Sequence, residues 1–123
     1  MIVVQLTESE PFVTKDGSQI RSLLDRTNAP VRNHSLAEAT LPAGRATLPH
    51  RHPHTEESYY VLSGTGRMTV GAERRDVGPG DAVLIPADSP HRLENTGEAP
   101  LVFLCCCSPP YSHDETVMEE PRE

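Results

Sequence analysis

The stretch GRATLPHRHPHTEESYYVLSGTG, residues 44–66, and the stretch GPGDAVLIPADSPHRLEN, residues 78–95, decide how this chain folds. The first carries His50 and His52, two residues apart, and the second carries His91. Because successive side chains alternate across a sheet, a spacing of two places His50 and His52 on the same face of one strand. His91 would come from a separate strand further along the chain. We therefore expect the three imidazoles to meet on one face.

Glu57 completes the expected set. Pro53 interrupts the strand of the paired histidines, so Glu57 is expected at the start of the following strand, folded back so that its carboxylate returns to the same face. Three neutral imidazoles and one carboxylate suit a divalent iron, manganese, nickel, copper or zinc ion. The sequence thus predicts one transition metal per chain, with the ligands His50, His52, Glu57 and His91.

The composition is compatible with a metal-binding domain and excludes other classes. At 123 residues the chain is long enough for one domain with its own core. A net charge of −7 argues against a nucleic-acid or anionic-membrane partner, and no apolar run approaches the roughly 20 residues of a membrane span. The N-terminus lacks the basic and apolar parts of a secretory signal. The cysteines are consecutive and point alternately on a strand, so they do not bridge easily, and we expect a reduced, cytoplasmic protein.

Short strands separated by turns account for most of the chain. Such strands, at intervals of about 8–12 residues, predict an all-β sandwich or barrel. The segment Ser18 to Asp25 fits either a helical turn or an N-terminal strand, and the strand is favoured. The other strands are expected at 35–41, 45–52, 57–63, 67–70, 73–77, 82–85, 90–95 and 100–107.

The two stretches resemble the two motifs of the cupin superfamily. The first motif is a glycine, H-x-H, a glutamate and a glycine, and the matching positions here are Gly44, His50, His52, Glu57 and Gly64. The second is a glycine, P-x-G, a histidine and an asparagine, and the matching positions are Gly80, Pro86, His91 and Asn95. Asp88 stands where the family usually has glycine; aspartate tolerates the unusual backbone angles of a turn, so the departure changes little.

The resemblance implies an all-β, double-stranded β-helix (a jelly-roll barrel), with one cupin domain over residues 1–123 and a core barrel at about 34–107. It also implies a homodimer and a small-molecule ligand or substrate. Beyond the four ligands, up to two positions stay open on a six-coordinate ion, which favours an oxidoreductase or dioxygenase-like enzyme acting on an oxygen-rich molecule. Decarboxylase, isomerase or cyclase chemistry, a binding or sensor module without catalysis, and a purely structural metal barrel remain as alternatives.

Several residues have competing interpretations. The alternative for the three histidines is that they are ordinary hydrogen-bonded side chains in a barrel that has lost its metal. Glu56 competes with Glu57 as ligand, because the family spacing permits both, and Glu57 is favoured by its distance to Gly64. His54, after Pro53, is expected in a surface loop, and Arg51 should face away from the metal. Tyr59 shares parity with Glu57, so it is the candidate catalytic residue for proton transfer or substrate orientation, against simple packing.

Other features stay open at this stage. Asn95 is expected to hold a backbone turn or to support the ligands from outside. Cys105 and Cys107 share one strand face and Cys106 the other, but the sequence does not fix which face is inward; buried packing is favoured over a thiol near the metal. Residues 108–123 are expected to form a surface tail, with the alternative that they fold over the barrel mouth.

Overall fold

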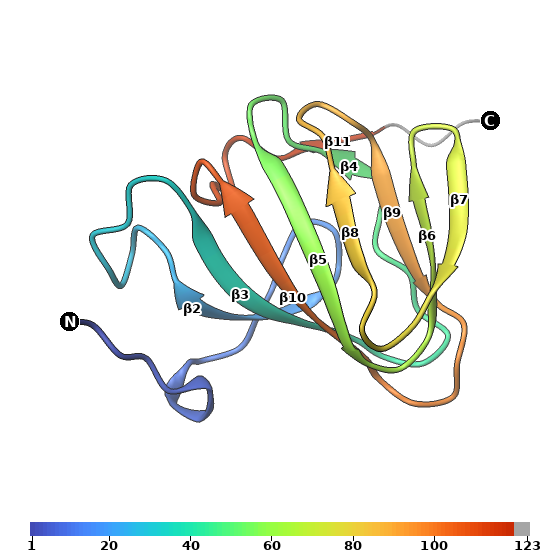
Figure 1. Cartoon of the computed structure of the whole chain (residues 1–123), viewed down its shortest axis with the longest axis horizontal. Helices are drawn as coiled ribbons and strands as arrows, with labels where there is room; N and C mark the ends of the chain where they lie inside the picture. The colour runs from blue at the N-terminus through green and yellow to red at the C-terminus, as the bar shows by residue number, and fades with distance from the viewer. Residues whose placement is uncertain (120–123) are drawn as a thin grey trace.

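Two facing antiparallel sheets make up the protein (Figure 1). The computed structural model describes residues 1–119, in which the helical structure is one short 3-10 turn, Leu6–Glu8. The first sheet has the strand order β1-β2-β3-β10-β5-β8 and the second β11-β4-β9-β6-β7. The strands are β1 (Phe12–Val13), β2 (Gln19–Leu24), β3 (Ser35–Leu41), β4 (His50–Arg51), β5 (Glu56–Ser63), β6 (Gly66–Val70), β7 (Glu73–Val77), β8 (Ala82–Ile85), β9 (His91–Asn95), β10 (Leu101–Ser108) and β11 (Val117–Met118). The all-β prediction is confirmed. No helix in the described part of the chain has the length and apolar character needed to span a membrane.

Most predicted strands lie where the sequence placed them, but the strand expected at 45–52 is reduced to His50–Arg51. Pro49 and Pro53 flank this short strand, and proline has no N–H to donate to a ladder. Ala46 keeps only an isolated bridge to Glu94. His52 therefore lies just after β4 rather than inside it, although the spacing of two still brings it to the side of His50.

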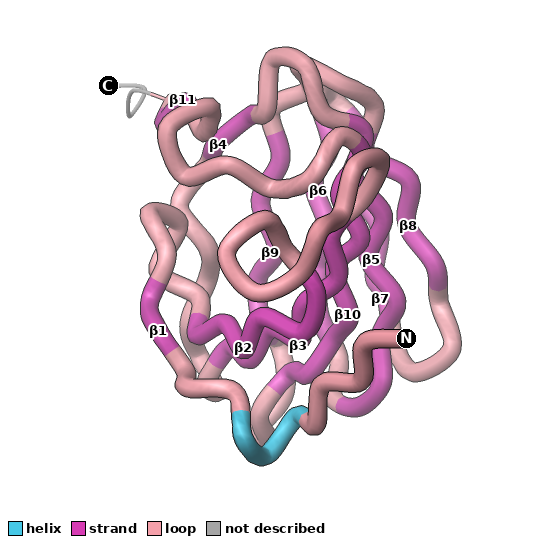
Figure 2. The backbone as a smooth tube through the Cα atoms, turned by 90° about the vertical axis from the view of Figure 1, so that its left-hand side faces the viewer, coloured by secondary structure: helices cyan, strands magenta, loops and turns pink. Residues whose placement is uncertain are grey.

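Both ends of the chain add strands to the barrel edges. The ambiguous segment Ser18 to Asp25 forms β2, which pairs with β3, and Phe12–Val13 adds a further strand that the sequence analysis did not expect. After Ser108, the chain does not leave the barrel, because β11 pairs with β4. Figure 2 shows β1 and β11 on the same side of the barrel. The turn after β1 and the segment before β11 also line the pocket beside the three histidines.

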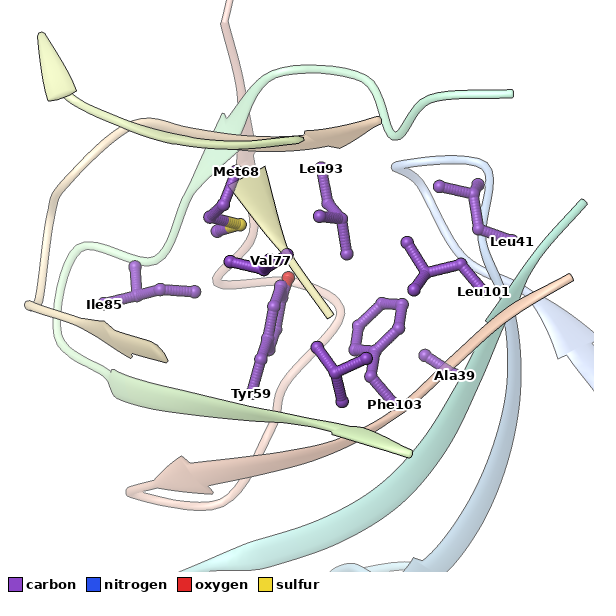
Figure 3. Close-up of a cluster of buried hydrophobic side chains, with 10 residues drawn as sticks. Ala39, Leu41, Tyr59, Met68, Val77, Ile85, Leu93, Leu101 and Phe103 are labelled. Carbon is purple, nitrogen blue, oxygen red and sulfur yellow. The ribbon is translucent and has the colours of Figure 1, made fainter. Parts of the chain in front are cut away.

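The hydrophobic core fills the space between the sheets (Figure 3). Strand β5 illustrates the pattern that builds it, since Glu57, Tyr59 and Val61 are buried and alternate with exposed neighbours. The ring of Tyr59 packs on Phe103 with centroids 4.7 Å apart. The buried apolar set is Ala39, Leu41, Tyr59, Val61, Met68, Val77, Ile85, Leu93, Leu101 and Phe103. The same alternation that fills the core thus aims Glu57 inward at one end of it.

Two turns show why particular residues occupy them. Gly64 has φ +86°, and a Cβ there would lie 2.6 Å from the carbonyl oxygen of Pro100, so only glycine fits. Asp88, which replaces the family's usual glycine, has φ +66°. Aspartate is among the residues that tolerate this left-handed region, and its carboxylate also pairs with Arg51.

Candidate metal centre

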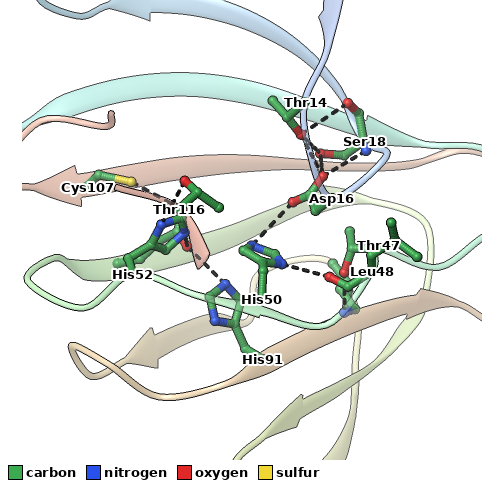
Figure 4. A network of polar contacts seen from close by, with 12 residues as sticks. Thr14, Asp16, Ser18, Thr47, Leu48, His50, His52, His91, Cys107 and Thr116 are labelled. Atoms are coloured by element: carbon green, nitrogen blue, oxygen red, sulfur yellow. Dashed lines mark hydrogen bonds and ion pairs between the residues drawn. The ribbon is translucent and has the colours of Figure 1, made fainter. Parts of the chain in front are cut away.

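Three buried histidines converge at one end of the barrel (Figure 4). His50 on β4 lies directly opposite His91 on β9 in the strand register, and His52 follows β4. One ring nitrogen from each of the three lies within 4.8 Å of the others. The prediction that these histidines meet is confirmed, and together they could hold a metal ion.

The Nδ1 atom of each ring is engaged away from the centre. His50 Nδ1 donates to the Leu48 carbonyl at 2.8 Å and His91 Nδ1 to the Ser89 carbonyl at 3.0 Å. His52 Nδ1 lies 3.3 Å from the Thr116 hydroxyl. This hydroxyl donates its own hydrogen to the Ser112 carbonyl, so it accepts the hydrogen bond from the His52 ring. In a neutral imidazole this leaves the lone pair on Nε2. All three lone pairs are thus available to a metal.

Glu57 faces the same point. Its Oε1 lies 3.4 Å from His52 Nε2 and 3.3 Å from His91 Nε2. Its Oε2 accepts a hydrogen bond from the Cys107 thiol at 3.2 Å. The alternation of β5 leaves Glu56 exposed, which excludes it from the cluster.

The unpartnered atoms of the cluster fit a bound cation. Within residues 1–119, Glu57 Oε1 and His91 Nε2 are buried and have no hydrogen-bond partner. Leaving such groups unsatisfied costs about 1–3 kcal/mol each, and a metal ion would satisfy both. Burial and the neighbouring His91 ring lower the pKa of His50, which favours the neutral imidazole that a metal needs.

A small pocket of about 60 Å³ opens beside the histidines. It has room for about four water-sized groups, at about 15 Å³ for each. Its walls are mostly apolar, with polar groups near the three histidines. Tyr111, from the segment after Ser108, also lines the pocket, and its ring centroid lies 6.1 Å from that of His52. The lining includes Phe12, Asp16, Ile20, Ala37, His50, His52, Glu57, Tyr59, Phe103, Cys105, Cys107, Tyr111 and Thr116.

Tyr59, the candidate catalytic residue, lines this pocket and is also part of the core. Its ring centroid lies 6.1 Å from that of His91. Burial, followed by the nearby charge of Glu57, raises the pKa of Tyr59 well above its ordinary value. The phenol therefore stays protonated at neutral pH, which suits hydrogen-bond donation rather than proton abstraction.

Residues next to the motifs take the places that were expected for them. Arg51 points away from the histidines and pairs with Asp88 and Glu119. His54 is exposed in the loop. Asn95 holds a turn, because its amide donates to the carbonyls of Leu41 and Ala99 while its oxygen accepts from the Gly97 N–H.

Three contributors to the site were not predicted from the sequence: Asp16, Thr116 and the inward orientation of Cys107. Asp16 Oδ2 lies 3.4 Å from His50 Nε2, and Thr116 contacts His52 as described above. The alternating pattern paired Cys105 with Cys107, but only the register that sets Cys107 opposite Glu57 shows that this face looks inward. The motifs carry no signal for Asp16 or Thr116, since both lie outside them.

The fold and the three-histidine centre are those of a cupin, and the chain belongs to this family: the family model described as cupin domain matches residues 37–107. The predicted double-stranded β-helix is thereby confirmed.

Among its relatives, a protein of Methanocaldococcus jannaschii described as the uncharacterised protein MJ1618 is 45% identical, over 98% of this chain and 100% of that protein. Oxalate decarboxylase OxdC of Bacillus subtilis is 35% identical over 81% of this chain, but the match spans only 27% of the enzyme. A crystal structure of a predicted oxalate decarboxylase from Thermotoga maritima superimposes with a TM-score of 0.77 at 26% identity, covering 87% of this chain and 98% of that one.

Proposed function

We propose that this protein is a small metalloenzyme that acts on an oxygen-rich small molecule at a mononuclear centre. One divalent ion of manganese, iron, nickel, copper or zinc per chain would be held by His50, His52, Glu57 and His91. The observation that carries this proposal is the inward set of donor atoms, in which Glu57 Oε1 and His91 Nε2 are buried without a partner at the wall of a pocket. A bound metal would polarise a substrate oxygen or bring substrate and O₂ together.

The residues of the chain prepare this chemistry. The carbonyls of Leu48 and Ser89 hold the His50 and His91 rings in the tautomer that a metal requires. Cys107 donates to one oxygen of Glu57 and leaves the other directed at the histidines. The mostly apolar walls of the pocket offer few hydrogen-bond partners to water, and Tyr59 would donate a hydrogen bond to orient the substrate. We favour an oxidoreductase or dioxygenase-like reaction, because positions beyond the four ligands stay open for substrate and O₂.

The pocket encloses about 60 Å³ beside the histidines, which is room for a group of a few non-hydrogen atoms. The rest of a longer substrate would extend through the open side of the pocket. The similarity to an oxalate decarboxylase over 81% of this chain makes cleavage of a small carboxylic acid the main alternative reaction within the enzyme class.

A binding or sensor module without turnover is the second candidate. The protonation of the side chains around the pocket favours it. Burial, with the charge of Glu57 second, raises the pKa of Cys105 and of Cys107 above the ordinary value, as it does for Tyr59. Side chains that stay protonated do not serve as nucleophile or base at neutral pH. A ligand would then bind the metal and leave unchanged.

Metal content is the first experiment. Untagged protein purified without chelator is analysed by elemental mass spectrometry, with the His91→Ala variant as the matched control. We expect about one ion per wild-type chain and none in the variant. No stoichiometric metal, even after reconstitution with each of the five ions, would refute the proposal. Loaded protein is then assayed for O₂ uptake and product formation with small acids and diols; saturable binding without either would favour the sensor.

We also propose a homodimer, as is common for small cupins, in a cytoplasmic setting compatible with three free cysteines. Tyr60, Leu62 and Leu84 are exposed on the outer face of the six-stranded sheet, where a second copy would cover them. Sedimentation equilibrium should give a dimer for the wild type and a monomer for Leu84→Asp. A wild-type monomer at micromolar concentration would contradict this assignment.

A further inference from the structure

The turn between β1 and β2 carries a carboxylate into the metal centre (Figure 4). Asp16 lies on this turn, its side chain is 13% exposed, and its Oδ2 is 3.4 Å from His50 Nε2. Glu57 Oε1 stands at the same 3.4 Å from His52 Nε2. Neighbouring donors on an octahedral ion with bonds of about 2.1 Å are about 3 Å apart. The distance from Asp16 Oδ2 to His50 Nε2 therefore equals the distance from Glu57 Oε1 to His52 Nε2, and both are close to the spacing of two donors on one ion.

The contact between Asp16 and His50 is favourable only when a cation lies between the two atoms, either a proton on Nε2 or a metal ion. The Nδ1–H of His50 donates a hydrogen bond to the Leu48 carbonyl, so the Nε2 of the neutral ring carries a lone pair. This lone pair faces Asp16 Oδ2, which is an acceptor as well. Two acceptors facing each other in a largely buried position repel, whereas a metal ion would accept electron density from both.

Hydrogen bonds to the two other oxygens of Asp16, Oδ1 and the backbone carbonyl, hold the residue in this orientation. Oδ1 accepts from the Thr14 hydroxyl at 2.6 Å, from the Ser18 hydroxyl at 2.6 Å and from the Ser18 N–H at 2.8 Å. The Asp16 carbonyl accepts from the Leu48 N–H at 2.7 Å, two residues before His50. These bonds leave Oδ2 as the one oxygen directed at the histidine.

Contacts with the C-terminal segment fix the turn itself. Lys15, next to Asp16, donates from Nζ to the carbonyls of His113 and Thr116 at 2.9 and 3.3 Å. Thr116 is also the residue that contacts His52. The turn and the C-terminal segment therefore position two different groups, Asp16 and Thr116, at two of the three histidines.

We propose that Asp16 is a fifth protein donor of the metal centre, delivered by the β1–β2 turn. The proposal rests on the metal centre of the proposed function and adds to it. A divalent ion with Glu57 alone would carry a net charge of +1, and Asp16 reduces this to zero. One position then stays open on a six-coordinate ion, so a bidentate substrate, or a substrate together with O₂, has to displace Asp16. The site would favour neutral or singly charged ligands over dianions.

The test compares Asp16→Ala with Asp25→Ala in metal-free protein reloaded with Co²⁺ or Mn²⁺. Asp25 is a matched control, because it also accepts hydrogen bonds within a turn, from Ser22 and Thr27, and lines the same pocket. Within residues 1–119 it makes no hydrogen bond or ion pair with a histidine, so it controls for the loss of a carboxylate near the pocket. We expect Asp16→Ala to weaken Mn²⁺ affinity by about 10-fold or more. Losing an outer-shell partner already costs at least that much, so the loss of a direct donor should cost no less. The visible absorption of the Co²⁺ form should change in Asp16→Ala and stay as in the wild type in Asp25→Ala.

Two further results decide the matter. Weaker affinity with an unchanged Co²⁺ spectrum would reveal only a charge effect at a distance and would overturn the proposal. Should Asp16→Ala fail to fold, the isosteric Asp16→Asn takes its place with the same two measurements. Weaker Mn²⁺ affinity together with a changed Co²⁺ spectrum supports the proposal, and an unchanged Co²⁺ spectrum overturns it. A wild type that binds no metal defeats the proposed function as well, whereas normal binding without a contribution from Asp16 defeats this inference alone.

Discussion

Binding of a metal should raise the melting temperature of this protein by an amount that can be calculated. A ligand present at 100 times its Kd stabilises the folded state by about 2.7 kcal/mol. For 123 residues the unfolding entropy is about 0.26 kcal/mol/K, so 1 kcal/mol corresponds to about 4 °C. We therefore expect a rise of about 10 °C between the chelated and the metal-saturated wild type, measured by differential scanning calorimetry.

The His91→Ala variant separates the metal from the packing of the barrel. In the metal-free protein, His91→Ala leaves a cavity, which lowers the stability of the fold. It also removes a buried nitrogen that has no partner in the wild type and destabilises the wild type by about 1–3 kcal/mol. The two effects oppose each other, so the metal-free variant should melt within several degrees of the metal-free wild type. The rise on adding metal should vanish in His91→Ala and persist in His54→Ala, whose ring is exposed. An equal rise in wild type and His91→Ala would refute the ligand assignment.

Three further outcomes follow from the geometry. Cys107→Ala removes the donor to Glu57 and should weaken metal affinity about 10-fold, with partial recovery in Cys107→Ser, as measured by chelator competition; unchanged affinity would show that the thiol does not position the carboxylate. Gly64→Ala places a Cβ 2.6 Å from the Pro100 oxygen at a positive φ and should lower the free energy of unfolding by more than about 2 kcal/mol in urea titrations, and a smaller loss would mean that the turn relaxes. Iodoacetamide at pH 8 should label Cys106 first, because burial raises the pKa of the other two thiols, and labelling of all three at one rate would contradict this.

Local periodicity predicted an all-β sandwich or barrel, and the resemblance to the two cupin motifs predicted the particular barrel and the inward group of side chains. The distance to Gly64 favoured Glu57 over Glu56, and the alternation of β5 agrees, with Glu57 buried and Glu56 exposed. The spacing of two groups His50 with His52 even where the strand is shorter than expected. Asp88 was expected to tolerate a turn that usually holds glycine, and its φ of +66° confirms this.

What the sequence did not reveal depends on long-range contacts. Asp16 reaches His50 only because β1 and β2 extend the first sheet and the Asp16 carbonyl bonds to Leu48. Cys107 meets Glu57 through the register of β10 on β5, which no local pattern specifies. Thr116 lies beside His52 because β11 pairs with β4 across more than 60 residues of chain.

The groups at the proposed centre come from two parts of the chain. All four proposed ligands lie within residues 37–107, the part that the cupin model matches, so the core would supply the whole four-ligand set. Asp16, Tyr111 and Thr116 lie outside that range, and they supply the extra charge, one wall of the pocket and the hydrogen bond to His52. The charge and the size of the acceptable substrate therefore depend on the flanking segments. The match to oxalate decarboxylase covers 81% of this chain, and we expect the carboxylate of the β1–β2 turn to decide, more than that similarity, which ligands the centre accepts.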